Sequence, residues 1–327
     1  MPETELHNNE GNGKPLVSVC CITYNQEAYI RDCLEGFVMQ KTDFPFEVLI
    51  HDDASTDRTA DIIREYEAKY PGIVKPICQK ENQRSKGIIN NIAYNYPRAQ
   101  GKYIALCEGD DYWTDPLKLQ KQFDFMESHP DYSGCFHNAI QKNEKTGSRE
   151  LYLKKPIKKD LSIGDILCNN GCMPTASVFF RAKFIKDISE YRKSAPVGDL
   201  PLEVCLADKG KVKYLDETMA VYRLFAAGSW SDRMAGNTEK AVSVFQRQIA
   251  WLDELAEMIH SQQDIDRAKG HIYIKMYELT RDYESIRNNK YAGEYLKTCP
   301  FPFRLKLLIK MNCPFVVRLL DRIKKKG

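Results

Sequence analysis

The feature that most constrains the fold is a set of three apolar segments, each of which ends in polar or acidic residues. They span residues 16–26, 46–59 and 102–113, and the last of them closes on Glu108-Gly-Asp110-Asp111. Short apolar runs of this kind are typical of buried strands. Because the carboxyl ends of parallel strands meet at one edge of an open α/β sheet, where such sheets bind ligands, we expect these polar residues to lie together.

The order of segments predicts an α/β fold. Helical spacing covers residues 27–40, 56–70 and 88–99, and these alternate with the strands above and a further strand at 73–79. This alternation is typical of a mostly parallel, twisted sheet with helices on both faces. Beyond it the pattern is mixed, with helices expected at 116–128, 162–168 and 199–208, and strands at 132–141, 175–180 and within 211–224.

We expect three parts along the chain. Residues 1–14, rich in Asn, Glu and Gly, predict a disordered leader. Residues 15–235 predict the α/β domain, divided into a first half at 15–130 and a mixed second half at 131–235. Residues 236–327 predict a helical region.

Composition limits the function. A net charge of +3 on 327 residues gives no case for nucleic-acid binding. Eleven cysteines, several of them inside apolar runs, and a polar start without a signal peptide predict a reducing cytoplasm. No apolar run reaches the ~20 residues that a membrane-spanning helix needs.

Several motifs, taken in order, resemble the family 2 glycosyltransferases with the GT-A fold. The matching pieces are Val17-Ser-Val-x-x-x-Thr-Tyr-Asn25, Asp52-Asp-Ala-Ser-Thr-Asp57, Glu108-Gly-Asp-Asp111 with Asp115-Pro116, Gly198-Asp199, Tyr222-Arg223 and Gly228-Ser-Trp230. The resemblance covers about residues 15–232. It implies that the first half binds a nucleotide sugar and the second half binds the acceptor.

The resemblance also assigns residues to the donor. It places the ring of Tyr24 against uracil, although an aromatic side chain packed at the sheet edge is the alternative. It makes Asp52 the acceptor for the imide N–H, which favours a UDP-sugar but leaves thymidine and guanosine nucleotides open. Apart from the resemblance, the loop at 82–87 supplies cations, Arg84 among them, near the place where the diphosphate would lie, although a solvated loop is the alternative. The same resemblance places Arg223 on the diphosphate, within a segment that closes over the donor.

Metal and catalytic residues follow from the same comparison of motifs. Asp111 is expected to bind Mg²⁺ or Mn²⁺ directly, and Asp110 to contact the ribose or the metal. Asp199 is expected to act as the general base of an inverting transfer, and the alternative is a plain helix N-cap. Two positions depart from the family pattern: Glu108 stands where many relatives have Asp, and Phe225 where many have His.

The last residues carry a separate signal. Residues 304–327 hold eight Lys and Arg against one Asp, among many apolar positions. Such a segment either lies on an anionic membrane or docks as a helix with a solvated basic tail. Peripheral contact with the inner face of the membrane would bring the enzyme to a lipid-linked acceptor.

Together these observations predict a transferase that adds single sugars from a nucleotide sugar to a glycan or lipid-linked acceptor. Processive synthases that resemble this family carry transmembrane helices and a Gln-x-x-Arg-Trp motif, and this chain has neither. A nucleotide- or glycan-binding protein without catalysis is the first alternative. A nucleotidyltransferase is the second, although the turn at residues 23–26 lacks the glycines of a triphosphate loop.

Overall fold

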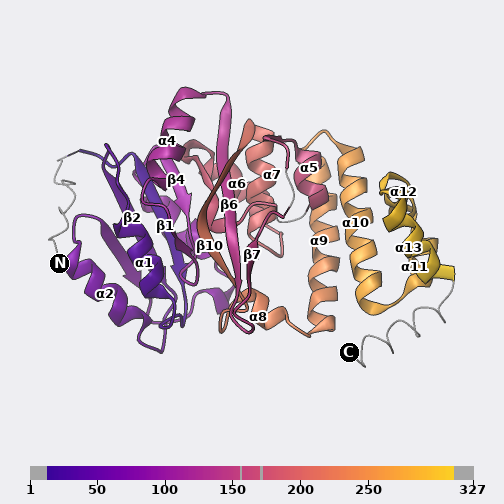
Figure 1. Cartoon of the computed structure of the whole chain (residues 1–327), viewed down its shortest axis with the longest axis horizontal. Coiled ribbons are helices and arrows are strands. Elements are labelled where there is room, and N and C mark those ends of the chain that lie inside the picture. The colour runs from indigo at the N-terminus through magenta and orange to yellow at the C-terminus, as the bar shows by residue number, and fades with distance from the viewer. Residues whose placement is uncertain (1–12, 155–156, 170–171, 313–327) are drawn as a thin grey trace. The chain divides into compact units, whose positions relative to one another are not determined.

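The computed structural model describes residues 13–154, 157–169 and 172–312, which fold as two compact units (Figure 1). The first unit holds residues up to 162, 172–193 and 199–235, and the second holds 163–169, 194–198 and the residues from 236. The predicted α/β class, with a helical C-terminal region, is confirmed. The leader at 1–12 and the end at 313–327 lie outside the described residues.

A single sheet forms the centre of the first unit, in the order β3-β2-β1-β4-β9-β6-β10-β5, with β7 beside β6 and β8 beside β10. The pairs β3-β2, β2-β1, β1-β4 and β6-β10 are parallel, and the other pairs are antiparallel. The strands are β1 (Val17–Thr23), β2 (Phe46–Asp52), β3 (Val74–Cys78), β4 (Tyr103–Leu106), β5 (Tyr112–Trp113), β6 (Tyr132–Asn143), β7 (Arg149–Leu151), β8 (Asp160–Leu161), β9 (Phe179–Arg181) and β10 (Lys211–Leu224).

Helices cover both faces of the parallel part of the sheet. Val17, Val19 and Cys21 alternate along β1 and pack into one core cluster together with side chains of α1 (Ile30–Val38), α2 (Thr59–Lys69) and α4 (Lys118–Ser128). Residues of opposite parity point to the other face. There α3 (Tyr96–Arg98) and the turn before it cover β1 and β2. The remaining helices of this unit are α6 (Ile185–Arg192), α7 (Asp199–Lys209) and α8 (Trp230–Met234).

Two predicted elements differ in detail. The expected helix at 88–99 is π-helical over Asn91–Asn95 before α3 begins, and Pro97 has no N–H to continue an α-helical hydrogen-bond ladder through this point. The expected strand at 175–180 begins instead with a 3₁₀ turn, Thr175–Ser177, because the backbone N–H and hydroxyl of Ser177 both bind the Pro174 carbonyl, at 2.8 and 2.6 Å. The strand β9 follows this turn.

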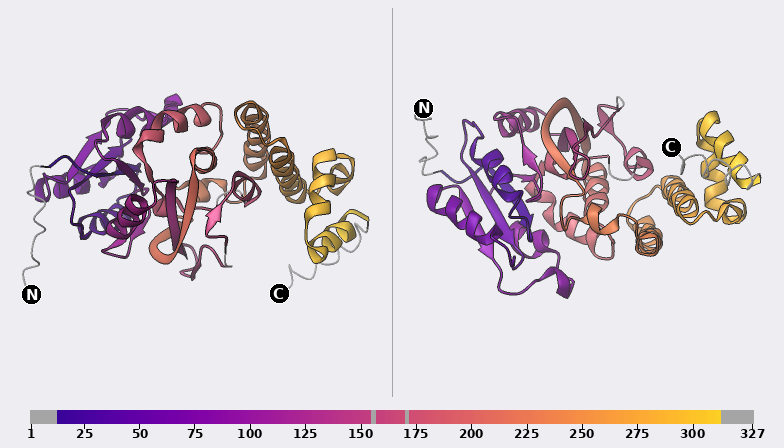
Figure 2. Two further views of the ribbon diagram at one scale, coloured as in Figure 1. Left: turned by 90° about the horizontal axis from the view of Figure 1, so that it is seen from above. Right: turned by 60° about the horizontal axis from the view of Figure 1, so that its bottom comes forward.

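The second unit is helical. Its helices are α5 (Ile163–Asn169), α9 (Thr238–Met258), α10 (Gln262–Thr280), α11 (Tyr283–Asn288), α12 (Lys290–Thr298) and α13 (Phe301–Asn312). The central helix α10 packs against α5, α9 and α12 (Figure 2). At the crossing with α12, a Cβ on Gly270 would lie 2.3 Å from the Tyr291 carbonyl, so the close approach requires glycine. Within the described ranges, no helix has both the length and the apolar composition needed to cross a bilayer.

Candidate active site

The loops that follow β1 and β2 are joined by hydrogen bonds. Asn25 takes a left-handed conformation with φ +51°, its N–H donates to the Ser55 hydroxyl at 2.8 Å, and its side-chain carbonyl accepts the N–H of Thr56 at 2.8 Å. The N–H of Gln26 donates to the Thr59 hydroxyl, also at 2.8 Å. The carboxylate of Asp57 also accepts the N–H of Glu27 at 3.0 Å, so the polar side chains of Ser55 and Asp57 fix the loop that follows β1.

Tyr24 and Asp52 lie at this edge, as predicted, but they differ in exposure. In the parallel register Thr23 pairs with Asp52, so Tyr24 follows β1 at the level where β2 ends. The ring of Tyr24 is exposed, whereas Asp52 is buried and accepts hydrogen bonds from the N–H and the hydroxyl of Ser55. Burial raises the pKa of Asp52 despite these two donors. In this structure the Asp52 carboxylate therefore stabilises the turn and presents almost no surface to a ligand.

The neighbouring Asp53 positions the loop that contains Arg84. Its two carboxylate oxygens accept the backbone N–H groups of Gln83 at 2.7 Å and of Arg84 at 3.0 Å. Ala54 adopts a left-handed conformation with φ +62° in the sharp turn that follows Asp53. Arg84 is exposed at the sheet edge, so the loop is fixed by its backbone while the side chain extends outward.

The acidic residues follow β4 in a tight turn. Asp110 and Asp111 are buried, Glu108 is half-buried, and the side chain of Asp111 accepts the N–H of Arg223 at 2.8 Å. A Cβ on Gly109 would lie 2.6 Å from the Thr23 hydroxyl. Glycine is therefore required at this position, because the turn packs directly on the end of β1.

Burial disfavours the ionised form of the acids at this edge. Burial raises the pKa of Asp110, and burial together with the Asp110 charge raises that of Asp111 well above its usual range. Burial, Asp110 and Asp199 raise the pKa of Glu108 to about 8. Asp199, the first residue of α7, thus lies close enough to Glu108 to disfavour its ionisation.

Asp199 keeps an exposed surface, yet the protein atoms around its carboxylate raise its pKa. The nearby Arg192 guanidinium and a hydrogen bond from the Thr175 hydroxyl oppose this rise without cancelling it. Folding therefore brings together the acids after β4 and the acid at the start of α7. We call Glu108, Asp110, Asp111 and Asp199 the acid edge.

Comparison with known proteins identifies the family. Residues 18–188, more than half of the chain, match the model for glycosyl transferase family 2. The chain belongs to glycosyltransferase family 2. It is 36% identical over 260 residues to Rv1520 of Mycobacterium tuberculosis, which covers 78% of this chain and 72% of that protein. It is also 36% identical over 201 residues to EpsE of Bacillus subtilis, a putative glycosyltransferase, covering 61% of this chain and 69% of that one.

Solved structures show the same fold. S. aureus TarS 1–349 in complex with UDP-GlcNAc has a TM-score of 0.58 at 17% identity and covers 90% of this chain and 86% of TarS 1–349. The Pyrobaculum calidifontis mannosyltransferase PcManGT, in complex with GDP-Man and Mn²⁺, has a TM-score of 0.56 at 13% identity and covers 91% and 85%. The predicted GT-A fold and enzyme class are confirmed, and the chain is a glycosyltransferase.

Arg223 of this glycosyltransferase has partners that differ from the predicted one. Its guanidinium is buried, donates to the Asp110 carbonyl at 2.7 Å, pairs with Glu144 at 3.0 Å and also pairs with Asp32. It further lies over the ring of Tyr112, with its centre 4.4 Å from the ring centroid. These contacts engage the guanidinium within the protein, and the expected contact with the diphosphate stays a prediction. They make Arg223 a positioning residue that holds the loop containing Asp110.

Sequence reasoning missed two arginines of this glycosyltransferase. Arg192 is buried near Asp199, and burial followed by the nearby charge of Arg84 lowers its pKa to about 10. Arg233 lies on the five-residue helix α8, close enough to lower the pKa of both Glu108 and Asp110 against the effect of burial. A single arginine in a short helix has no periodic signal that could have revealed either one.

Glu203, one turn after Asp199, is fully buried rather than available to substrate. Its carboxylate accepts the Cys172 thiol and the Met173 N–H, both at 3.3 Å. Burial and the neighbouring charge of Asp199 raise its pKa to about 8. Glu203 therefore positions the segment at 172–173 and influences Asp199 through charge.

The acid edge of the glycosyltransferase fits a divalent cation only in part. Among the described residues, no three acidic, His or Cys side chains converge as a complete ligand set. The donor atoms of Asp110 and Asp111 are carboxylate oxygens, which Mg²⁺ and Mn²⁺ prefer. Burial is the main cause of the raised pKa of both carboxyl groups, and for Asp111 the charge of Asp110 adds to it. These residues fit a metal that takes its other ligands from substrate oxygens or water.

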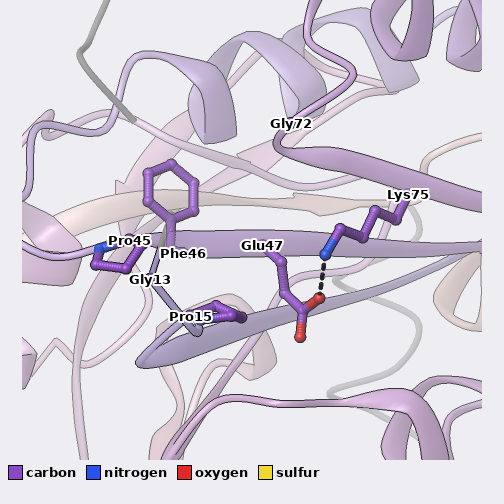
Figure 3. Close-up of a pocket in the computed structure, with 7 residues that line it drawn as sticks. All are labelled: Gly13, Pro15, Pro45, Phe46, Glu47, Gly72 and Lys75. Carbon is purple, nitrogen blue, oxygen red and sulfur yellow. Dashed lines mark hydrogen bonds and ion pairs between the residues drawn. The ribbon is translucent and has the colours of Figure 1, made fainter. Parts of the chain in front are cut away.

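A small pocket lies far from this chemistry, at the amino ends of β1, β2 and β3 (Figure 3). It has a volume of about 90 Å³ and contains Glu47, whose carboxylate is paired with Lys75 at 2.8 Å. The same carboxylate accepts the Ser18 hydroxyl at 2.7 Å and the Gln100 N–H at 2.8 Å. These three donors stabilise the ionised carboxylate, so we assign it a role in stability and no role in ligand binding.

Proposed function

We propose that this enzyme transfers one sugar from a nucleotide-diphosphate sugar, preferably a UDP-sugar, to a glycan or lipid-linked acceptor with inversion at the anomeric carbon. The observation that carries the proposal is the placement of Asp199 beside the acids that follow β4. Glu108 interacts electrostatically with both Asp110 and Asp199, although the two come from separate halves of the sheet. A general base and a leaving-group site are thereby adjacent, as a single displacement requires.

In this proposal the loops after β1 and β2 hold the donor. The exposed ring of Tyr24 stacks on the base. Asp52 accepts the imide N–H after its hydrogen bond with the Ser55 hydroxyl has broken. Arg84 reaches the diphosphate from a loop that Asp53 holds in place. Asp110 contacts the ribose or the metal.

The transfer itself needs a base and charge compensation. Asp111, with Asp110, would hold Mg²⁺ or Mn²⁺, which offsets the charge that builds up on the leaving diphosphate. Asp199 removes the proton from the acceptor hydroxyl. At the same time the hydroxyl oxygen bonds to the anomeric carbon, from the face opposite the departing nucleoside diphosphate. Arg233 and Arg192 lie near this edge and add positive charge beside the reacting groups.

Two observations on relatives support the donor and the acceptor class. TarS was solved with UDP-GlcNAc and PcManGT with GDP-Man and Mn²⁺, so a nucleotide-diphosphate sugar is common to both. TuaG of Bacillus subtilis, a putative teichuronic acid biosynthesis glycosyltransferase, is 39% identical over 115 residues, which is 35% of this chain.

We further propose a reducing, cytoplasmic location, which the ten free cysteines among the described residues support.

Calorimetric binding of UDP, GDP, dTDP and ADP, each with and without Mn²⁺, tests the site. We expect binding of UDP that depends on Mn²⁺ and disappears in Asp111→Asn. Asp124→Asn, an exposed acid on α4, is the matched control and should bind as the wild type does. Metal-independent binding, or none, would overturn the assignment of Asp111. Binding without turnover of any UDP-sugar would favour the alternative of a nucleotide-binding protein.

A further inference from the structure

The last described helix, α13, exposes a stripe of large apolar side chains. Phe301, Leu305, Leu308 and Ile309 follow the spacing i, i+4, i+7 and i+8, which places them on one face, and each is between 40% and 63% exposed. Leu307 points the other way and is buried with Ile274, Ile286, Ala292 and Leu296 of the second unit. The helix is therefore held by one face while the apolar stripe faces outward.

Cations flank this stripe, and α13 contains no acid. On a helical projection Arg304 and Lys306 fall on opposite sides of the stripe, while Lys310 is paired with Glu278 at 2.7 Å. The fifteen residues beyond the described structure, 313–327, add five Lys and Arg against one Asp. The charge of this end of the chain is thus complementary to a negatively charged surface.

We propose that α13 binds the surface of a bilayer that contains anionic lipids, with Phe301, Leu305, Leu308 and Ile309 inserted among the acyl chains. An apolar stripe with cations at its borders is the pattern by which a helix lies in the membrane interface. Long Lys and Arg side chains reach the headgroups while their stems cover apolar surface. A second copy of the chain is a poorer occupant, because its own flanking cations would face those of the first.

Membrane binding would give the enzyme access to a lipid-linked acceptor, and only this part of the inference rests on the proposed function. Membrane binding itself depends on α13 and not on the acid edge. The two proposals can therefore fail separately, and an experiment on binding to vesicles distinguishes them.

Co-sedimentation of the full chain with vesicles tests the proposal. We expect binding to an equal mixture of phosphatidylcholine and phosphatidylglycerol, weak binding to phosphatidylcholine alone, and loss of binding as salt is added. Leu308→Ser combined with Ile309→Ser should lower the partition coefficient more than about tenfold, because two inserted apolar side chains are lost. The control is Leu279→Ser on α10 combined with Met258→Ser on α9, which removes two side chains that are each 42% exposed. This variant should leave the partition coefficient unchanged.

Further variants keep the test decisive if the double variant unfolds. Phe301→Ser alone, at the most exposed position of the stripe, and Arg304→Gln with Lys306→Gln should each reduce binding to the mixed vesicles. Equal binding by all these variants, or equal binding to both kinds of vesicle, would overturn the proposal. A dimer in analytical ultracentrifugation that Leu308→Ser abolishes would show that a second copy covers the stripe instead. UDP binding should be the same in every stripe variant.

Discussion

The two ends of the parallel sheet each bury a carboxylate, with opposite consequences. Glu47 at the start of β2 and Asp111 after β4 are both 1% exposed. Burial opposes the ionisation of Glu47, but Lys75, Gln100 and Ser18 outweigh it and lower its pKa. Burial and Asp110 raise the pKa of Asp111 well above its usual range. Burial alone therefore does not identify a functional acid. The direction of the pKa shift differs between the two ends because the neighbouring charges and hydrogen-bond donors differ.

The largest effect that would sharpen this comparison is expected for Asp199→Asn. If Asp199 is the general base, kcat should fall by about 10²–10⁴-fold while UDP affinity remains. The free energy of unfolding should not fall, because the substitution removes repulsion with Glu108 and Glu203. The measurement is nucleotide release with a UDP-sugar and an acceptor. Glu190→Gln, an exposed acid on α6, is the control, and unchanged turnover in Asp199→Asn would exclude the base assignment.

Arg223→Met should have the next largest effect, on stability. Removing this buried cation takes away its charge-assisted hydrogen bond to the Asp110 carbonyl and its contact with the Tyr112 ring. It also breaks the pairs with Asp32 and Glu144, although Glu144 keeps Lys142. The free energy of unfolding should therefore drop by about 3–5 kcal/mol. Denaturant unfolding measures the change. Arg233→Met, at an exposed position, should change it by less than about 1 kcal/mol. A stable Arg223→Met protein that no longer binds UDP would favour the expectation that Arg223 contacts the diphosphate.

Glu47→Gln should be milder, because Lys75 is 41% exposed and stays solvated without its partner. We expect a loss of about 2–3 kcal/mol in the free energy of unfolding, from weakened charge-assisted hydrogen bonds, and an unchanged kcat at a permissive temperature. Glu65→Gln, which removes an exposed ion pair with Arg31, is the stability control. A fall in kcat without a loss of stability would contradict the assignment of Glu47 to stability alone.

The effect that is smallest within one pH unit is a slope in stability that comes from Glu203. Its pKa rises from 4.5 to about 8 on folding, so between these values the folded chain holds a proton that the unfolded chain has lost. The free energy of unfolding should then decrease as pH rises, by up to about 1.4 kcal/mol per pH unit, and Glu203→Gln should remove this decrease. Urea unfolding at several pH values measures the slope.

Glu47→Gln serves as the control for that slope. The lowered pKa of Glu47 means that its carboxylate is ionised in both states between about pH 5 and 8, so this variant should run parallel to the wild type there. Its contribution is lost only as pH falls through the acid range. A Glu203→Gln profile parallel to the wild type would contradict the raised pKa of Glu203.

The parts of the site that were predictable are those with local signals. Apolar runs followed by Asn25, Asp52 and Asp111 revealed strands and turns, because each depends on residues adjacent in the chain. The partners of Arg223 were not predictable, since Asp32 comes from α1 and Glu144 from the turn after β6. The roles that came from the family resemblance remain predictions, namely those of Tyr24, Asp52, Asp110, Asp111, Asp199 and Arg223. The role of Arg84 remains a prediction from the charge of its loop.

The same reasoning explains the errors in local structure. The strand expected at 175–180 failed because Ser177 binds the carbonyl of Pro174, a choice that the alternation of side chains does not reveal. The helix at 88–99 was recognised, but its π-helical turn depends on Pro97 and on the side chain of Asn95, which donates to the Cys21 carbonyl at 2.9 Å. Such tertiary contacts decide details that periodicity leaves open.

The short strand β5 also has a consequence for the synthesis of the protein. It follows the acidic turn and pairs with Ala220 and Val221 of β10, while the N–H of Arg223 reaches back across 112 residues to Asp111. A ribosome adds the intervening residues in on the order of ten seconds. During that time the nascent chain already contains the motifs of the first half, but the acidic turn lacks the strand that fixes it. If the acid edge binds the donor as proposed, binding can therefore begin only after β10 has emerged, and a chain arrested before residue 211 would carry the recognisable motifs without their geometry.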